Sequence, residues 1–176
     1  MHHFGTLIES SLRNMVEAEL GPGAWDSIQR DAVIEQVNDP EITHEISQLH
    51  SWCKLATKRL RREQTAVMLD LGIRWWSTSK PSRSVKGTLN ERRKSLLEQV
   101  RSDMDLLRSG LIVAPHIGLY PSYGFMLHHT RPIKRCRAFL FGVLRGAGKT
   151  HRLPIDIRLL EPYELNGHSD ILAVEY

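Results

Sequence analysis

The sequence has little cysteine, no long apolar run and no recognisable leader. Its 176 residues include two cysteines, Cys53 and Cys136, and neither belongs to a CxxC pair. We therefore expect no disulfide framework and a reducing compartment. No apolar stretch approaches the roughly 18 residues that cross a bilayer. The start, MHHFGTLIESS, lacks a long apolar core, so we expect no signal peptide and a cytoplasmic location.

The motifs that most often mark an enzyme or a metal centre are absent or out of register. The chain has no HExxH, no paired CxxC and no GxSxG, the patterns of common zinc and serine-hydrolase sites. GAGKT (146–150) resembles part of a P-loop, but that motif needs a glycine where Val143 stands. We interpret it as a glycine helix stop with a basic turn. His128 and His129 would face opposite sides of a strand and so cannot share a metal. We predict no enzymatic activity.

Charges of opposite sign collect in different parts of the chain, whose formal net charge is +4. Acidic residues cluster in the first 45 residues, and basic residues dominate 54–62 and the span from Arg131 to Arg152. A basic surface can attract nucleic acid or anionic partners, whereas a solvated helix face explains the same pattern without a partner. No aromatic residues interleave with the basic run to stack on bases. We favour the solvated face and predict neither nucleic-acid nor membrane binding.

Apolar residues at helical spacing predict a series of helices in the first half of the chain. GPG (21–23) should end the first helix, and 77–87 should form a polar loop. Asn90 should cap the last helix, and Gly110 should end it. The inward residues of the five helices are Phe4, Leu7, Ile8, Leu12, Met15, Val16 and Leu20; Trp25, Ile28 and Ala32; Ile42, Ile46, Leu49, Cys53, Ala56 and Leu60; Val67, Leu71 and Trp75; and Leu96, Leu97, Val100, Met104 and Leu107.

After Gly110 the pattern changes to short apolar and aromatic runs. LIVAP (111–115) and GLYPSYGFMLHH (118–129) predict strands, and LPIDIRLLE (153–161) and DILAVEY (170–176) predict two more. Helical spacing returns between them, in IKRCRAFLFGVLRG (133–146). Helices followed by strands, with one helix among them, predict an α+β fold. We expect a single domain over 1–176, with an N-terminal helical subdomain and a small antiparallel sheet.

Five segments, in order, resemble parts of one known family. They are LGPGAWDSI (20–28), EQTAVMLDLGIRWW (63–76), DMDLLRSGL (103–111), VAPHI (113–117) and FMLHHTRPIKRCRAFLFGVL (125–144). Together they resemble the heme-nitric oxide/oxygen-binding (H-NOX) domain, the sensor domain of soluble guanylate cyclase and of bacterial signalling proteins. The closing strands fit the hairpin of that family. The resemblance implies the α+β fold of H-NOX domains and heme b as the cofactor to test.

The chain departs from the family at the residues that hold heme. The proximal histidine, which ligates the iron, aligns with Arg108, and an arginine is always protonated and cannot serve as that ligand. The Y-x-S-x-R motif, which binds the heme propionates, aligns with His129, Arg131 and Ile133. Arg131 can still hold a carboxylate. We expect Arg108 to meet a carboxylate or a bound anion, or to reach solvent, because an unpaired buried guanidinium is costly.

Two neighbouring residues near these positions also bear on heme binding. Pro115, which presses on the porphyrin in H-NOX domains, is retained, and His116 follows it as a candidate substitute iron ligand. His129 is the other candidate iron ligand, if heme is bound at all.

Two functions remain open from the sequence. In the first, the chain is a divergent H-NOX-like signalling module that lacks histidine-ligated heme and binds another apolar or anionic ligand or a partner protein. In the alternative, it is a nitric oxide or oxygen sensor that binds heme through a non-standard ligand such as His116 or His129. By resemblance, the signalling partner would be a histidine kinase, a cyclic-di-GMP enzyme or a chemoreceptor.

Overall fold

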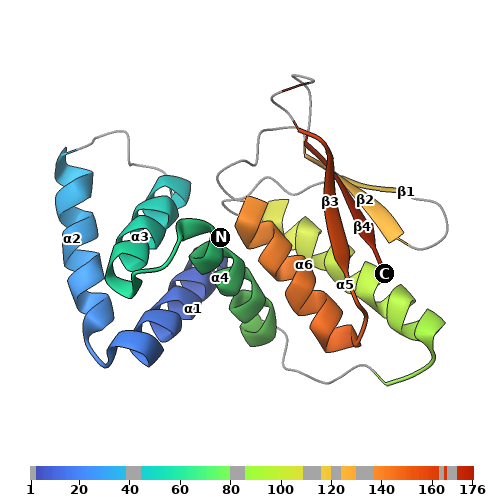
Figure 1. The fold of residues 1–176 in the computed structure, drawn as a ribbon, viewed down its shortest axis with the longest axis horizontal. Coiled ribbons are helices and arrows are strands. Elements are labelled where there is room, and N and C mark those ends of the chain that lie inside the picture. The colour runs from blue at the N-terminus through green and yellow to red at the C-terminus, as the bar shows by residue number, and fades with distance from the viewer. Residues whose placement is uncertain are drawn as a thin grey trace.

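The computed structural model describes residues 3–38, 45–79, 86–108, 116–119, 124–129, 137–162, 165 and 170–176. Four helices form the N-terminal part, and two further helices accompany a sheet (Figure 1). The order along the chain is α1 (His3–Leu20), α2 (Ala24–Asn38), α3 (Glu45–Leu60), α4 (Gln64–Ser79), α5 (Leu89–Arg108), β1 (His116–Leu119), β2 (Gly124–His129), α6 (Arg137–His151), β3 (Asp156–Glu161) and β4 (Asp170–Glu175). Within the described part of the chain, no helix is long and apolar enough to cross a membrane.

The N-terminal helices form because their apolar residues recur on one face, and that face is buried. Leu12 and Met15 of α1 are fully buried, as helical spacing predicts. Trp25 and Ile28 of α2 are equally buried, and the ring of Trp25 meets that of Trp52 of α3 edge-on, with centroids 5.7 Å apart. The predicted first four helices are therefore confirmed where they are described, with α3 beginning at Glu45. The prediction that Leu20 faces inward is wrong, because this last residue of α1 is exposed.

The segment that leads into α5 differs from the prediction. Helix α4 continues to Ser79, two residues beyond the predicted start of the polar loop at Ser77. The cap of α5 is Thr88, not Asn90: the backbone N–H of Glu91 donates to Thr88 Oγ1 at 3.3 Å, and the N–H of Thr88 donates to Glu91 Oε2 at 2.7 Å. This T-x-x-E capping box satisfies two free donors at once, so it outcompetes Asn90. The backbone N–H and the hydroxyl of Thr88 both donate to the Glu91 carboxylate and lower its pKa.

The four strands form one antiparallel sheet in the order β1-β2-β4-β3. The predicted stretch 118–129 is thus described as parts of two strands, while LIVAP (111–115) lies outside the described residues. Alternation along β2 buries Phe125 and Leu127, and their partners on β4 are Val174 and Leu172. These residues form the face of the sheet that joins the core.

Helix α6 extends through GAGKT (146–150) to His151, so the predicted glycine stop is wrong. The glycines serve close packing instead. A Cβ on Gly142 would lie 2.0 Å from the carbonyl oxygen of Leu69, and a Cβ on Gly72 would lie 2.1 Å from that of Phe139. The backbones of α4 and α6 therefore nearly touch. Because GAGKT ends a helix rather than opening one, it does not form a P-loop.

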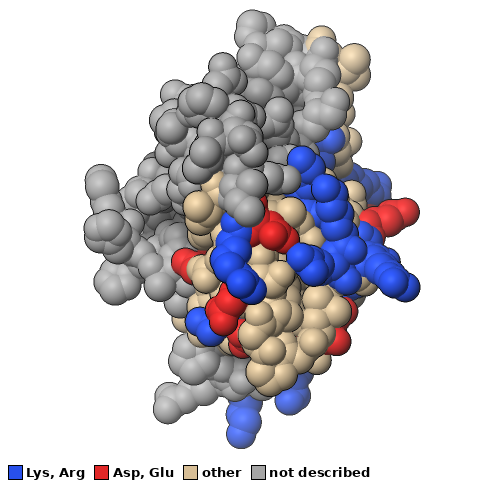
Figure 2. Space-filling view, turned by 90° about the vertical axis from the view of Figure 1, so that its left-hand side faces the viewer, with Lys and Arg blue, Asp and Glu red and all other residues tan. Residues whose placement is uncertain are grey.

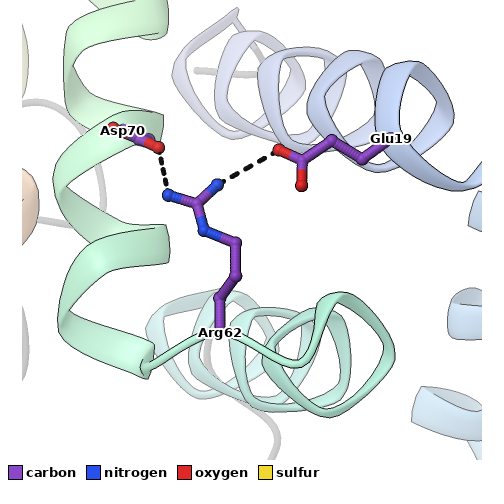
Figure 3. Close-up of polar contacts among 3 residues, drawn as sticks. All are labelled: Glu19, Arg62 and Asp70. Carbon is purple, nitrogen blue, oxygen red and sulfur yellow. Dashed lines mark hydrogen bonds and ion pairs between the residues drawn. The ribbon is translucent and has the colours of Figure 1, made fainter.

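A cluster of charges holds the N-terminal helices together at the end of α3. Figure 2 looks onto the side of the molecule that lies on the left in Figure 1, where basic side chains gather with acidic ones among them. Arg62, just after α3, contacts Glu19 of α1 at 3.1 Å and also pairs with Asp70 of α4 (Figure 3). The hydrogen bond to Asp70 raises the pKa of Arg62. Arg59 of α3 contacts Asp31 of α2 at 2.8 Å.

Replacing Arg62 by methionine, which keeps much of the apolar stem, should remove both contacts to α1 and α4. We expect a loss of about 1 kcal/mol in the free energy of unfolding, because part-exposed ion pairs are individually weak and two are lost. Urea unfolding at low salt measures it. Arg13→Met, which breaks only the pair with Glu17 within α1, should cost less. An equal effect of the two variants would contradict a tie between helices.

Candidate functional site

The interior between α4, α5, α6 and the sheet is part of the hydrophobic core. Trp75 of α4 and Phe139 of α6 meet there with ring centroids 6.0 Å apart. Phe125 of β2 and Leu96 and Val100 of α5 belong to the same core. All five are at most 1% exposed.

The predicted site residues fall at the ends of elements or outside the described residues. Arg108 is the last residue of α5, and the structure describes its backbone but not its side chain. Pro115, Arg131 and Ile133 lie outside the described residues. The predictions that Arg108 meets a carboxylate, an anion or solvent, and that Arg131 holds a carboxylate, therefore stay predictions.

Register separates the two candidate histidines. His116 begins β1 and pairs with His128, whereas His129 ends β2 and pairs with Asp170. Partners in an antiparallel ladder belong to the same row of residues. His116 thus stands in the row of His128, and His129 continues the row of Phe125 and Leu127. No group of three or more His, Cys, Asp or Glu residues that could hold a metal ion occurs in the described part of the chain.

A fully buried histidine, His151, joins α6 to α5 and was not singled out from the sequence. Its Nδ1 lies 2.8 Å from the carbonyl oxygen of Ala147, and its Nε2 lies 3.3 Å from Ser95 Oγ on α5. The carbonyl can only accept, so Nδ1 carries the proton and Nε2 accepts from the hydroxyl. Burial lowers the pKa of His151, although the bond to Ala147 opposes this. No local pattern pointed to this residue, because the predicted helix ended before position 151.

The beginning of α5 is tied to the end of β4. The guanidinium of Arg93 lies 5.9 Å from the ring centre of Tyr176, and its Nη2 donates to the Tyr176 carbonyl oxygen at 3.4 Å. Burial raises the pKa of Tyr176, and the charge of Arg93 opposes that rise. Helix α5, whose last residue is Arg108, is therefore anchored at its other end by both Tyr176 and His151.

By sequence, the chain matches no protein-family model and no curated protein. Among solved structures, an H-NOX domain from Shewanella oneidensis in the Fe(II)CO ligation state matches over 96% of each chain, with a TM-score of 0.69 and 18% identity. The chain has the H-NOX fold. The S. oneidensis H-NOX protein in the Fe(II)NO ligation state covers 96% of this chain and 97% of its own, with a TM-score of 0.59 and 19% identity.

An H-NOX structure from a second organism also matches this chain. The structure of a mutant H-NOX protein from T. tengcongensis matches 97% of this chain and 96% of its own, with a TM-score of 0.63 and 12% identity. The predicted resemblance and the predicted α+β class are confirmed. Identities this low establish the H-NOX fold alone, so the roles assigned to Arg108, Pro115, His116, His129 and Ile133 remain predictions.

Proposed function

We propose that this chain is an H-NOX-fold sensor and signalling module that works without histidine-ligated heme. It would bind another apolar or anionic ligand, or act through a partner protein. The observation that carries the proposal is Arg108 at the end of α5, the position that the resemblance aligns with the iron-ligating histidine. The chain keeps the H-NOX fold, so we infer that the arginine at this position changes which ligand is bound and leaves the fold unchanged.

The chemistry of the residues present does not suit heme. An arginine at position 108 supplies a permanent charge and no lone pair to iron. His129, Arg131 and Ile133 replace the residues that bind the propionates, so two of three contacts of that type are lost. Charge-assisted hydrogen bonds contribute roughly 1.5–3 kcal/mol each.

The competing function is a heme-based gas sensor with a substitute ligand. It gains support from the H-NOX relatives above, whose structures were solved with CO or NO on ferrous iron. His129 is the better substitute, because its row on β2 is the row that faces the core. His116 pairs into the other row.

A titration of the purified protein with hemin, followed by absorption, tests the two functions. We expect no sharp Soret band at one equivalent, because the histidine ligand of the iron and two of the three propionate contacts are replaced. His129→Ala and His116→Ala are the matched variants. A saturable Soret band that shifts in either variant, but not in His128→Ala, would establish the heme sensor and overturn the proposal.

A further inference from the structure

Two histidines stand directly opposite each other on neighbouring strands. His116 of β1 is the ladder partner of His128 of β2. Residues directly opposite in an antiparallel pair have Cβ atoms about 4.5–5.5 Å apart, and an imidazole nitrogen binds a metal ion at about 2 Å. Two histidines at this spacing can therefore bind one ion together. The adjacent residues His128 and His129 cannot, because neighbours along a strand belong to opposite faces.

The histidine pair belongs to the face of the sheet opposite the core. Phe125 and Leu127 of β2 are buried in the core, so alternation assigns His128 to the other face, which we call the outer face. His128 is half-buried there. Within the described ranges, no hydrogen bond or ion pair joins its ring to another residue. No described residue therefore competes with a ligand for the imidazole of His128.

A third possible donor, the thioether of Met126, belongs to the same outer face. Met126 precedes His128 by two residues, so alternation assigns both to one side of β2. The ladder partners of Met126 are Gly118 on β1 and Ala173 on β4, two of the smallest residues. The half-buried methionine therefore has little beside it in its row, and its three rotatable bonds let the sulfur adapt to an ion bound by the histidines.

These three donors suit copper(I) better than zinc. Imidazole binds both ions, whereas a thioether is a soft ligand that selects copper(I). Zinc in structural sites takes four ligands, drawn from Cys, His, Asp and Glu. The part of the chain that the structure describes holds no group of three such residues that could bind a metal ion. Two imidazoles and a thioether therefore point to copper(I).

The charges described on the outer face do not oppose a bound cation. Arg158 of β3 is the ladder partner of Ala173 and so stands in the row of Met126. Its guanidinium contacts Asp156 at 2.8 Å and Glu175 at 3.3 Å. Asp156 and Glu175 are themselves ladder partners on this face. Two carboxylates thus accompany one guanidinium, which leaves no excess of positive charge among these residues.

We propose that His116, His128 and Met126 form a copper(I) site on the outer face of the sheet. Two opposed imidazoles repel each other once both are protonated, so their pairing is most favourable when an ion binds between them. This inference goes beyond the proposed function and does not depend on it, because the core face of the sheet is not involved. It also gives His116 a role other than that of a substitute iron ligand.

The test is a competition for copper(I) against bicinchoninate without oxygen, in which the absorbance of the copper complex falls as the protein takes the ion. The parent chain should remove one equivalent more than His116→Ala or His128→Ala. The remaining histidines, including His2 and His3, are common to all samples, so the difference reports the pair alone. Met126→Leu, which keeps the size of the side chain, should weaken binding about tenfold, since only the thioether is lost.

His129→Ala is the matched control, because it removes the adjacent histidine from the other row and should bind copper(I) as the parent does. Equal loss in this control, or no loss in His116→Ala and His128→Ala, would overturn the site. Zinc(II) binding that needs both histidines, with Met126→Leu unchanged toward copper(I), would overturn the choice of ion. Circular dichroism verifies folding, and His128→Asn replaces a variant that unfolds. Hemin is titrated separately, so a Soret band would overturn the proposed function alone.

Discussion

Gly142→Ala is expected to lower the free energy of unfolding by about 3 kcal/mol, the upper end for an overpacked site. In an unconstrained helix, the same change stabilises by roughly 1 kcal/mol, since alanine is the better helix former. Here the new Cβ would meet the Leu69 carbonyl oxygen at 2.0 Å and the Cα of Gly72 at 3.0 Å. Backbone atoms cannot move aside without separating α4 from α6, so the sign reverses. Thermal melts should show a midpoint lower by roughly 10 °C.

The matched control is another glycine of the same helix, one turn further along. At Gly146 a Cβ would lie 3.0 Å from the Trp76 Cβ and 3.2 Å from the Ile73 carbonyl oxygen, a milder crowding. Gly146→Ala should therefore cost clearly less than Gly142→Ala. If the two variants are equally stable, or if Gly142→Ala is stabilised, the close crossing of α4 and α6 is not what holds the two parts of the chain together.

The second large effect is a loss of stability on acidification that depends on His151. Burial lowers the pKa of His151 in the folded chain, so the unfolded chain takes up the proton first as the pH falls. The stabilisation is complete above about pH 6.5, the value of an unfolded histidine, and is lost as the pH falls toward the folded-state pKa. Urea unfolding between pH 5 and pH 8 should show this decline in the parent chain.

Two variants separate the proton from the hydrogen bond. His151→Gln should lower stability at pH 7.5 by about 2 kcal/mol and flatten the decline below pH 6.5. Ser95→Ala removes the partner on α5 and should cost about 1 kcal/mol while keeping the decline. A parent chain whose stability does not change between pH 7 and pH 5, or a His151→Gln variant with the same decline, would refute this role.

Sequence reasoning predicted the elements better than their ends. The apolar spacing of a helix depends on many residues, so one residue that breaks the spacing does not hide the apolar faces of α1 to α5. Ends depend on one or two contacts. Asparagine often caps helices, which is why Asn90 was predicted. Thr88 is the cap instead, because a capping box needs a glutamate three residues after the cap, and Glu91 stands there. Gly146 marks a helix end by type, yet it lies where α6 packs against Trp76 of α4, a contact that no local pattern reveals.

The candidate site was predictable only through the resemblance. By the resemblance, Arg108 stands where H-NOX domains carry the iron-ligating histidine, and this assignment stays a prediction, because the comparisons establish the fold alone. The separation of His116 and His129 into different rows was not predictable, since it depends on the register of β1 against β2. The burial of His151 also required the structure, because its partner Ser95 lies 56 positions away.

The central claim is that an H-NOX fold is used here without histidine-ligated heme. The most direct measurement is the absorption spectrum of the protein purified from cells supplied with a heme precursor, reduced and then exposed to CO. We predict no stoichiometric Soret band and no shift with CO, because Arg108 offers iron no ligand. A stoichiometric band that moves on adding CO would contradict this claim and establish a heme-based gas sensor.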